Sequence, residues 1–206
     1  MTISARRQAR HQALIAHDAP LWDAGLVFAG IDEAGRGPLA GSVFAACAVM
    51  PREPSLLWVD DSKKLSEKRR EGLHDQILAT ALFANVGHAT PEEIDEMNIL
   101  EATKLAMRRA AEGCPAQVYL IDAVRAVGLR GRELPIIRGD ALSYSIAAAS
   151  ILAKVERDRE MRTLDAKYPQ YGFARNKGYG TQEHIRALMR FGPCPLHRSS
   201  FIGHFV

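Results

Sequence analysis

The sequence predicts an α/β domain in which helices flank a mixed β-sheet, with a small helical segment after about residue 167. Short apolar runs of strand length come first and then alternate with longer stretches of helical composition. No internal repeat or linker divides the 206 residues, of which 47% are hydrophobic. That suits one sizeable core. We therefore expect a lead-in over residues 1–25 and one domain over 26–206, with 167–206 as a helical appendage.

The first half of the chain begins with the polar, basic residues 1–25, which we interpret as loosely attached. Residues 26–31 form a compact apolar run that suits a buried strand. The glycines and proline of residues 32–38 indicate a loop there. A second apolar run over 41–50 predicts another strand, which ends at Pro51.

Two helices and a third strand are expected in the middle of the chain. Ser66 can cap a helix whose residues Leu73 and Ile77 share one face. A strand follows over 82–88. Thr90 and Glu93 then form a capping box around a proline, so a second helix starts there and runs to about residue 111.

The second half continues the alternation. Residues 118–121 predict a short strand that ends at Asp122, and a basic, glycine-containing loop leads to Asp140. Residues 144–164 have the composition of a long helix that begins just after Asp140. A glycine-rich loop over 177–181 precedes a further helix to about residue 191.

Composition excludes several classes of protein. No apolar run approaches the roughly 20 residues of a membrane span, and no secretory signal opens the chain. Cys47, Cys114 and Cys194 are scattered, which argues against a disulfide framework and a zinc cage. We expect a cytoplasmic protein. The formal net charge of +3 permits a polyanionic partner without requiring one.

Acidic residues at the ends of apolar runs are the main chemical signal. Asp32 and Glu33 follow the first predicted strand, Asp122 follows a later one, and Asp140 opens a helix. Burying a carboxylate is costly unless a partner compensates it. Helix capping would explain Asp140 alone, whereas shared divalent cations would explain the set, since oxygen ligands suit Mg²⁺ or Mn²⁺. Neighbouring strand residues point to opposite faces, so Asp32 and Glu33 share a site only if the strand ends or distorts there.

The sequence around these acids resembles type 2 ribonuclease H, bacterial ribonuclease HII. Six blocks occur in that family's order between about residues 27 and 201. They are GIDEAGRGPLAG at 30–41, DSKKLS at 61–66, LID at 120–122, RGD with SIAAASILAKV at 138–140 and 145–155, KGYGT at 177–181 and HRSSF at 197–201. Two departures are Ala123-Val124, where many members have glycine and asparagine, and Asn176, where histidine is frequent.

The resemblance implies an RNase H-like fold and a catalytic, metal-binding quartet of Asp32, Glu33, Asp122 and Asp140. It implies an endoribonuclease that uses two Mg²⁺ or Mn²⁺ ions. The expected substrates are RNA–DNA hybrids and duplex DNA with single embedded ribonucleotides, as in ribonucleotide excision repair. Cleavage on the 5′ side of the ribonucleotide would leave a 5′-phosphate and a 3′-hydroxyl. We take a monomer as the default, and a replication-clamp partner stays open.

Substrate recognition must sense the 2′-hydroxyl, which distinguishes RNA from DNA. The resemblance assigns this to the loop Gly35, Arg36 and Gly37, whose glycines let backbone approach a ribose, and it places Tyr179 against the sugar at the DNA–RNA junction. Candidate phosphate contacts are Arg36, Lys63, Lys64, Lys177 and Arg198, with Ser62 and Ser200 as hydrogen-bond donors. Lys154 is interpreted as holding the acidic cluster or the fold together.

Three alternatives stay open at this point. A DNA resolvase on a similar sheet would use similar acids without discriminating ribose. A type 3 ribonuclease H would cut longer hybrids, although members of that group usually carry an extra N-terminal domain. A non-catalytic duplex-binding module would not need four carboxylates.

Overall fold

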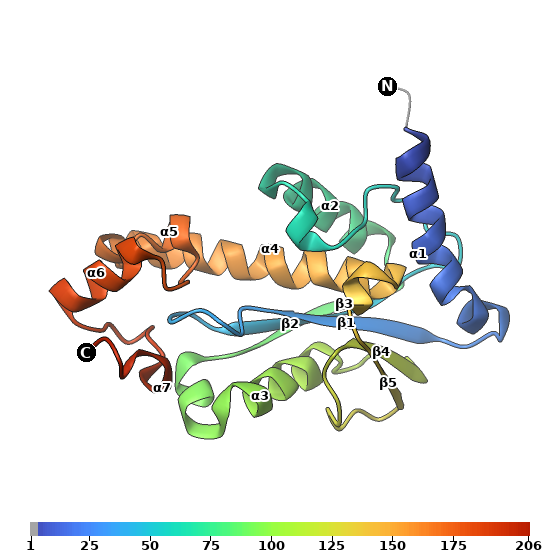
Figure 1. Ribbon diagram of the computed structural model, residues 1–206. Coiled ribbons are helices and arrows are strands. Elements are labelled where there is room, and N and C mark those ends of the chain that lie inside the picture. Colours follow the sequence, from blue (N-terminus) through green and yellow to red (C-terminus); the bar gives the residue numbers. More distant parts are fainter. Residues whose placement is uncertain (1–3) are drawn as a thin grey trace.

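A five-stranded mixed sheet forms the centre of the computed structural model, which describes residues 4–206 (Figure 1). The strand order is β3-β2-β1-β4-β5. β2 runs antiparallel to β1 and β3, whereas β4 and β5 run parallel to β1. The strands are β1 (Phe28–Ala34), β2 (Val43–Val49), β3 (Phe83–Ala89), β4 (Val118–Asp122) and β5 (Arg132–Ile136). The prediction of a mixed sheet flanked by helices is confirmed.

Helices cover both faces of the sheet. Helices α1 (Ala5–Asp23), α2 (Glu67–Thr80) and α4 (Tyr144–Lys167) lie on one face, and α3 (Pro91–Ala110) lies on the other (Figure 1). Each face has its own core of buried side chains, because alternate strand residues point in opposite directions. Ile31 and Cys47 belong to the α3 side, and Ala46 and Ala48 to the α4 side.

Close packing of α4 on the sheet depends on small residues. A Cβ on Gly30 would lie 2.1 Å from the carbonyl carbon of Ser145, so only glycine fits at this point of β1. The stretch 147–149 of α4 is entirely alanine and is fully buried. These residues bring the first turns of α4 against β1 at the strand end that carries Asp32.

The predicted helix starts are confirmed. The Ser66 side chain accepts a hydrogen bond from the Arg69 N–H at the start of α2. Thr90 and Glu93 form both hydrogen bonds of a capping box at the start of α3. Each interaction satisfies backbone N–H groups that the helix itself leaves unpaired.

The expectation that residues 1–25 are loosely attached is wrong. Helix α1 is capped by Ser4, and Leu14 is fully buried under it. Asp18, also fully buried, accepts a hydrogen bond from the Ser145 N–H at 2.9 Å, at the N-terminus of α4. Arg10 donates to Asp60 and to the carbonyl of Ala141. The helix therefore supports the segment that follows Asp140 through polar contacts, which a search for apolar periodicity does not detect.

Two further differences concern strands. β1 continues through Asp32 and Glu33 to Ala34, pairing with β2 as far as Ala34 and Phe44. The expected ending at residue 31 applies only to its pairing with β4. β5 was not expected, because its charged, Pro135-containing sequence lacks an apolar run. It lies at the sheet edge, where proline is tolerated.

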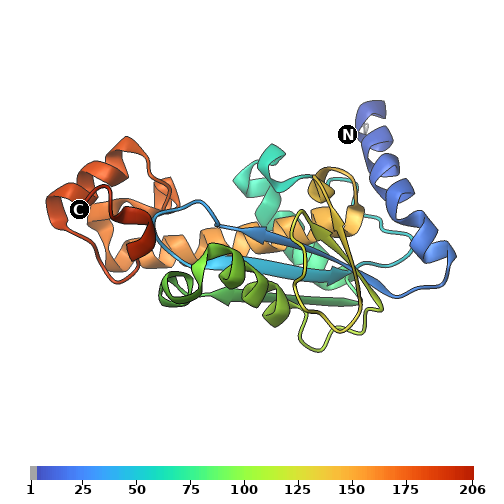
Figure 2. The same ribbon diagram turned by 60° about the horizontal axis from the view of Figure 1, so that its bottom comes forward.

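The chain after residue 167 forms short helices at the far end of α4 (Figure 2). They are α5 (Phe173–Asn176), α6 (Gln182–Phe191) and α7 (Ser199–Ile202), preceded by the 3-10 turn η3 (Pro169–Tyr171). Two further 3-10 turns, η1 (Ser62–Lys64) and η2 (Gly139–Ala141), lie earlier in the chain. Within residues 4–206, no helix combines the length and apolar character needed to cross a bilayer.

Candidate active site

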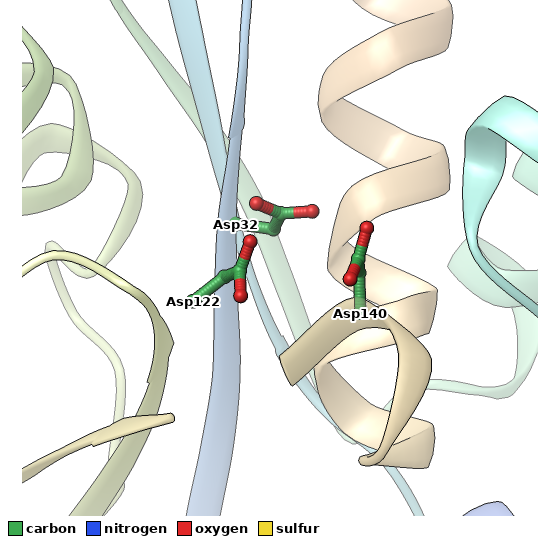
Figure 3. A group of neighbouring side chains, drawn as sticks. All are labelled: Asp32, Asp122 and Asp140. Carbon is green, nitrogen blue, oxygen red and sulfur yellow. The ribbon is translucent and has the colours of Figure 1, made fainter. Parts of the chain in front are cut away.

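Three aspartates from separate parts of the chain converge at one end of the sheet (Figure 3). Each of Asp32, Asp122 and Asp140 offers a carboxylate oxygen, and these oxygens lie within 4.8 Å of one another. The convergence follows from the topology: β1 and β4 are parallel neighbours with Ile31 beside Ile121, so the next residue of each strand reaches the same edge. Asp140 joins them from η2, just before α4.

Backbone contacts hold the three side chains in place. The Asp122 carboxylate accepts a hydrogen bond of 2.6 Å from the Gly139 N–H, which fixes the segment that carries Asp140. A Cβ on Gly139 would lie 2.5 Å from Cδ1 of Ile146, so the segment also packs tightly against α4. Ser143 rather than Asp140 caps α4. The capping interpretation of Asp140 is therefore wrong, and its carboxylate is free to face the other two.

The site concentrates negative charge in buried surroundings. Burial, with the nearby carboxylates of Glu33 and Asp122, raises the pKa of Asp32 well above its usual value. Burial and Asp140 likewise raise the pKa of Asp122, although the hydrogen bond from Gly139 opposes this. The Lys63 Nζ lies 3.4 Å from Asp140 and supplies a partial counter-charge. The carboxylates thus repel one another, and a cation would relieve the repulsion.

Glu33 is not part of this cluster of three. On β1 it alternates with Asp32 and so points away from the α4 face. Its Oε1 lies 3.6 Å from Nη1 of Arg36, and its buried Oε2 has no hydrogen-bond partner among the described residues. Burial, followed by the charge of Asp122, raises the Glu33 pKa against the influence of Arg36. Glu33 is therefore adjacent to the cluster, and its Oε2 is available to accept a hydrogen bond or to bind a cation.

The donor set fits a hard divalent cation. Asp32, Asp122 and Asp140 offer only carboxylate oxygens, with no histidine nitrogen or cysteine sulfur among them. Such ligands suit Mg²⁺ and Mn²⁺ and do not suit a structural zinc.

A cavity of about 210 Å³ adjoins the carboxylates and contains much of the predicted recognition site. The exposed Tyr179 borders it, and a Cβ on Gly37 would meet the Tyr179 ring at 3.9 Å. The lining residues are Asp32, Glu33, Ala34, Gly35, Arg36, Gly37, Ser62, Lys63, Lys154, Arg157 and Tyr179. The structure thus brings the glycine loop, the acids and the tyrosine together around one hollow.

Two buried arginines, Arg157 and Arg198, hold the glycine loop, and their burial was not predicted from the sequence. Arg198 was predicted as a phosphate contact, but its side chain is fully buried and donates to the carbonyls of Gly35, Arg36 and Gly41. Burial lowers the Arg198 pKa to about 9. Arg157 donates to the Lys177 carbonyl and packs against Gly35, where a Cβ would lie 2.0 Å from its Nε. Gly35 is therefore required by this packing as well as by its φ of +96°.

The other predicted contacts differ in accessibility. Lys63 is exposed beside the site, and Ser62 is buried there. Lys64 is exposed as well, but it pairs with Asp61 and lies outside the cavity. Lys177 donates to the Ala174 carbonyl and is only partly exposed. Ser200 is exposed but bonded to Asp95, outside the cavity. Lys154 pairs with Asp158 at 2.6 Å, in keeping with its interpretation as a holding residue.

The structure shows the conformation or the contacts of the residues at both departures from the family pattern, Ala123 and Asn176. Ala123 adopts a left-handed φ of +51°, a conformation that glycine accepts without strain. The buried Asn176 accepts a hydrogen bond from the Gly178 N–H and donates to the Tyr171 carbonyl. It thereby supports the loop that carries Tyr179.

Comparisons with known proteins agree with this geometry. Residues 29–204 match the family model described as Ribonuclease HII. The ribonuclease HII of Desulfitobacterium hafniense DCB-2 is 55% identical over 195 residues, which cover 93% of this chain and 75% of that protein. Among solved structures, the Archaeoglobus fulgidus protein of a PCNA:RNase HII complex has a TM-score of 0.71 at 29% identity, covering 83% of this chain and 91% of that one. Ribonuclease H2 from Pyrococcus horikoshii has a TM-score of 0.70 at 27% identity, with coverages of 84% and 92%.

Proposed function

The chain belongs to the ribonuclease HII family, and from this premise we propose that it cleaves on the 5′ side of ribonucleotides that lie in a duplex with DNA. It is a metal-dependent nuclease of the ribonuclease H type. The proposed substrates are RNA–DNA hybrids and duplex DNA with single embedded ribonucleotides, and the proposed products carry a 5′-phosphate and a 3′-hydroxyl.

The observation that carries the proposal is the convergence of Asp32, Asp122 and Asp140 within 4.8 Å. Two divalent cations held by these carboxylates, with Glu33 turned toward the second, would lower the pKa of the attacking water and stabilise the leaving 3′-oxygen. The protein's part is to hold Asp32, Asp122 and Asp140 in place, through the hydrogen bond from Gly139 and the packing of β1 and η2 against α4. Lys63 would then lie beside the phosphate as well as beside Asp140.

Ribose discrimination is proposed to arise from the cavity next to the acids. Arg198 and Arg157 fix the backbone of the Gly35–Gly37 loop, so its peptide groups would meet a 2′-hydroxyl in a preorganised geometry. Tyr179 borders the same hollow with its ring exposed, and it would pack against the sugar at the junction. Lys64 and Arg36 would contact phosphates without reading sequence.

A cleavage assay on two matched duplexes tests the proposal. One duplex carries a single ribonucleotide and the other is all DNA, and each is assayed with Mg²⁺, with Mn²⁺ and with chelator. We expect cleavage of the first alone, dependent on metal, with a 5′-phosphate at the ribonucleotide. Asp32→Asn should abolish turnover while leaving duplex binding largely intact. Equal cutting of both duplexes would favour a resolvase, and metal-independent binding without cleavage would favour a binding module.

A further inference from the structure

A chain of buried hydrogen bonds links the C-terminal segment to the main chain of Tyr179. The Cys194 N–H lies 3.0 Å from Nδ1 of His197, and Nε2 of His197 lies 3.1 Å from Nε2 of His184. Nδ1 of His184 lies 2.9 Å from the carbonyl oxygen of Tyr179. Both imidazoles are buried, at 0% and 4% exposure. Neither histidine belongs to the carboxylate site or to the cavity beside it.

The partners at the two ends fix which nitrogens carry protons. A carbonyl oxygen only accepts, so Nδ1 of His184 donates to Tyr179. In a neutral ring, Nε2 of His184 then accepts, and Nε2 of His197 must donate to it. That leaves Nδ1 of His197 as the acceptor for the Cys194 N–H, which is a closer partner than the Cys194 carbonyl oxygen at 3.3 Å. All three hydrogen bonds thus donate in the same direction, from the Cys194 N–H through His197 and His184 to the Tyr179 carbonyl.

The surroundings keep both rings neutral. Tyr171 and Phe173 pack edge-on against them, with ring centroids 4.8 Å from His197 and 5.4 Å from His184 respectively. Burial lowers the pKa of both histidines, that of His197 to about 4. The order of donors and acceptors therefore persists at neutral pH.

His184 adds a side-chain donor to a loop that backbone hydrogen bonds also hold: the Tyr179 N–H donates to the Asn176 carbonyl, and the Tyr179 carbonyl also accepts from the Thr181 N–H. The two preceding residues, Lys177 and Gly178, both have left-handed φ values, of 51° and 78°. Within the described residues, His184 is the side chain that hydrogen-bonds the main chain of Tyr179. The Tyr179 ring itself is 45% exposed, so packing fixes it only in part.

We propose that His184 and His197 are positioning residues, which hold Tyr179 at the sugar of the ribonucleotide through this neutral, one-directional hydrogen-bond chain. The inference rests on the proposed role of Tyr179 in substrate recognition. It assigns two tasks to neighbouring residues, because Arg198, next to His197, holds the glycine loop that lines the same cavity.

Paired substitutions of each histidine by asparagine and by glutamine test the direction in which these hydrogen bonds donate. Asparagine can mimic the Nδ1 edge of a histidine, and glutamine the Nε2 edge. His184→Asn keeps the donor to Tyr179 and should retain kcat/KM on the single-ribonucleotide duplex within about twofold. His184→Gln loses that donor and should lower kcat/KM by about three- to tenfold, the effect of one net hydrogen bond. At position 197 the order reverses: His197→Gln keeps the donor to His184, and His197→Asn loses it.

Controls separate positioning from folding and from the proposed function. Thermal unfolding of all four variants is measured, and each matched pair should unfold at a similar temperature while differing in kcat/KM. In a Tyr179→Ala background, His184→Gln should have no further effect. Nitrogen NMR of the wild-type protein should show His184 protonated at Nδ1 and His197 at Nε2.

Four results would overturn the inference. Equal kcat/KM within each matched pair would do so, as would the opposite ring tautomers. An undiminished effect of His184→Gln in Tyr179→Ala would show that the histidines act elsewhere. If Tyr179→Ala alone left kcat/KM unchanged, the role of Tyr179 in the proposed function would fail first and the positioning role with it.

Discussion

The repulsion among the carboxylates of Asp32, Asp122 and Asp140 predicts that Asp32→Asn makes the metal-free protein more stable. Two carboxylates whose oxygens lie within 4.8 Å of one another repel by at least about 3 kcal/mol at an effective dielectric constant of about 20. Asp32 faces two such neighbours and is 4% exposed, so removing its charge also removes a desolvation cost. The amide oxygen can still accept the 2.7 Å hydrogen bond from the Glu33 N–H. The nearby Lys63 ammonium offsets part of this repulsion, so we expect a net gain of about 2 kcal/mol, or about 4–8 °C in Tm for a chain of this length.

The assay is urea unfolding at neutral pH with chelator, alongside Asp23→Asn as a matched control. Asp23 lies at an exposed end of α1 and pairs with Arg52, so its neutralisation should change stability by less than about 0.5 kcal/mol. The pKa of Asp32 is raised in the folded state, so between its unfolded and folded pKa values the folded protein binds a proton that the unfolded chain has lost. The loss of stability caused by the charged Asp32 is therefore complete only above the folded pKa. The advantage of Asp32→Asn should therefore shrink as the pH falls through the raised pKa of Asp32 toward its unfolded value of about 4.

Divalent metal should reverse the order of stability, so that the wild-type protein becomes more stable than Asp32→Asn. Saturating Mg²⁺ or Mn²⁺ stabilises the wild-type fold by mass action and should stabilise Asp32→Asn much less. If Asp32→Asn were no more stable than the Asp23→Asn control in chelator, the three carboxylates would not be repelling one another, and the reasoning would be refuted.

Three further predictions concern the scaffold. Glu93→Gln removes the charge of the α3 capping box and its ion pair with Arg109, and it should lower the unfolding free energy by about 1 kcal/mol at pH 7, measured by urea unfolding. Because the Glu93 pKa is lowered to about 2, this loss should vanish as the pH falls from about 4 to 2. A loss of stability that persists at pH 2 would contradict this. Arg198→Met leaves three buried carbonyls without their donor and should lower stability by about 2–4 kcal/mol; a loss below about 0.5 kcal/mol would show that the loop holds itself. Ala123→Gly relieves a left-handed alanine and should raise the unfolding free energy by up to about 1 kcal/mol, whereas a clear loss of stability would argue against strain at this position.

The sequence predicted the carboxylate site because its signal is local. Apolar runs that end in acid, such as the one before Asp122, show where strands reach the sheet edge, and the family blocks indicate which edges meet. The same reasoning placed Tyr179 on an exposed loop between glycines. The positions of the acids and of Tyr179 could be inferred because each depends on the composition of a short stretch of sequence.

Other features depend on contacts between distant residues, and the sequence alone did not predict them. A buried arginine and a surface arginine have the same local sequence signal, so Arg198 was assigned to phosphate although it binds backbone carbonyls. Helix α1 is held by Asp18 and by arginines paired with Asp60, which apolar periodicity does not register. The alternation along β1 separates Glu33 from Asp32, as the pleat requires when the strand continues to Ala34.

The most direct test of the central claim is anomalous diffraction from crystals of this protein grown with Mn²⁺. We expect a manganese peak within about 2.5 Å of carboxylate oxygens from Asp32, Asp122 and Asp140 together, and its loss in Asp32→Asn. Manganese bound elsewhere, with these three carboxylates left without a shared ion at a concentration that supports cleavage, would contradict it.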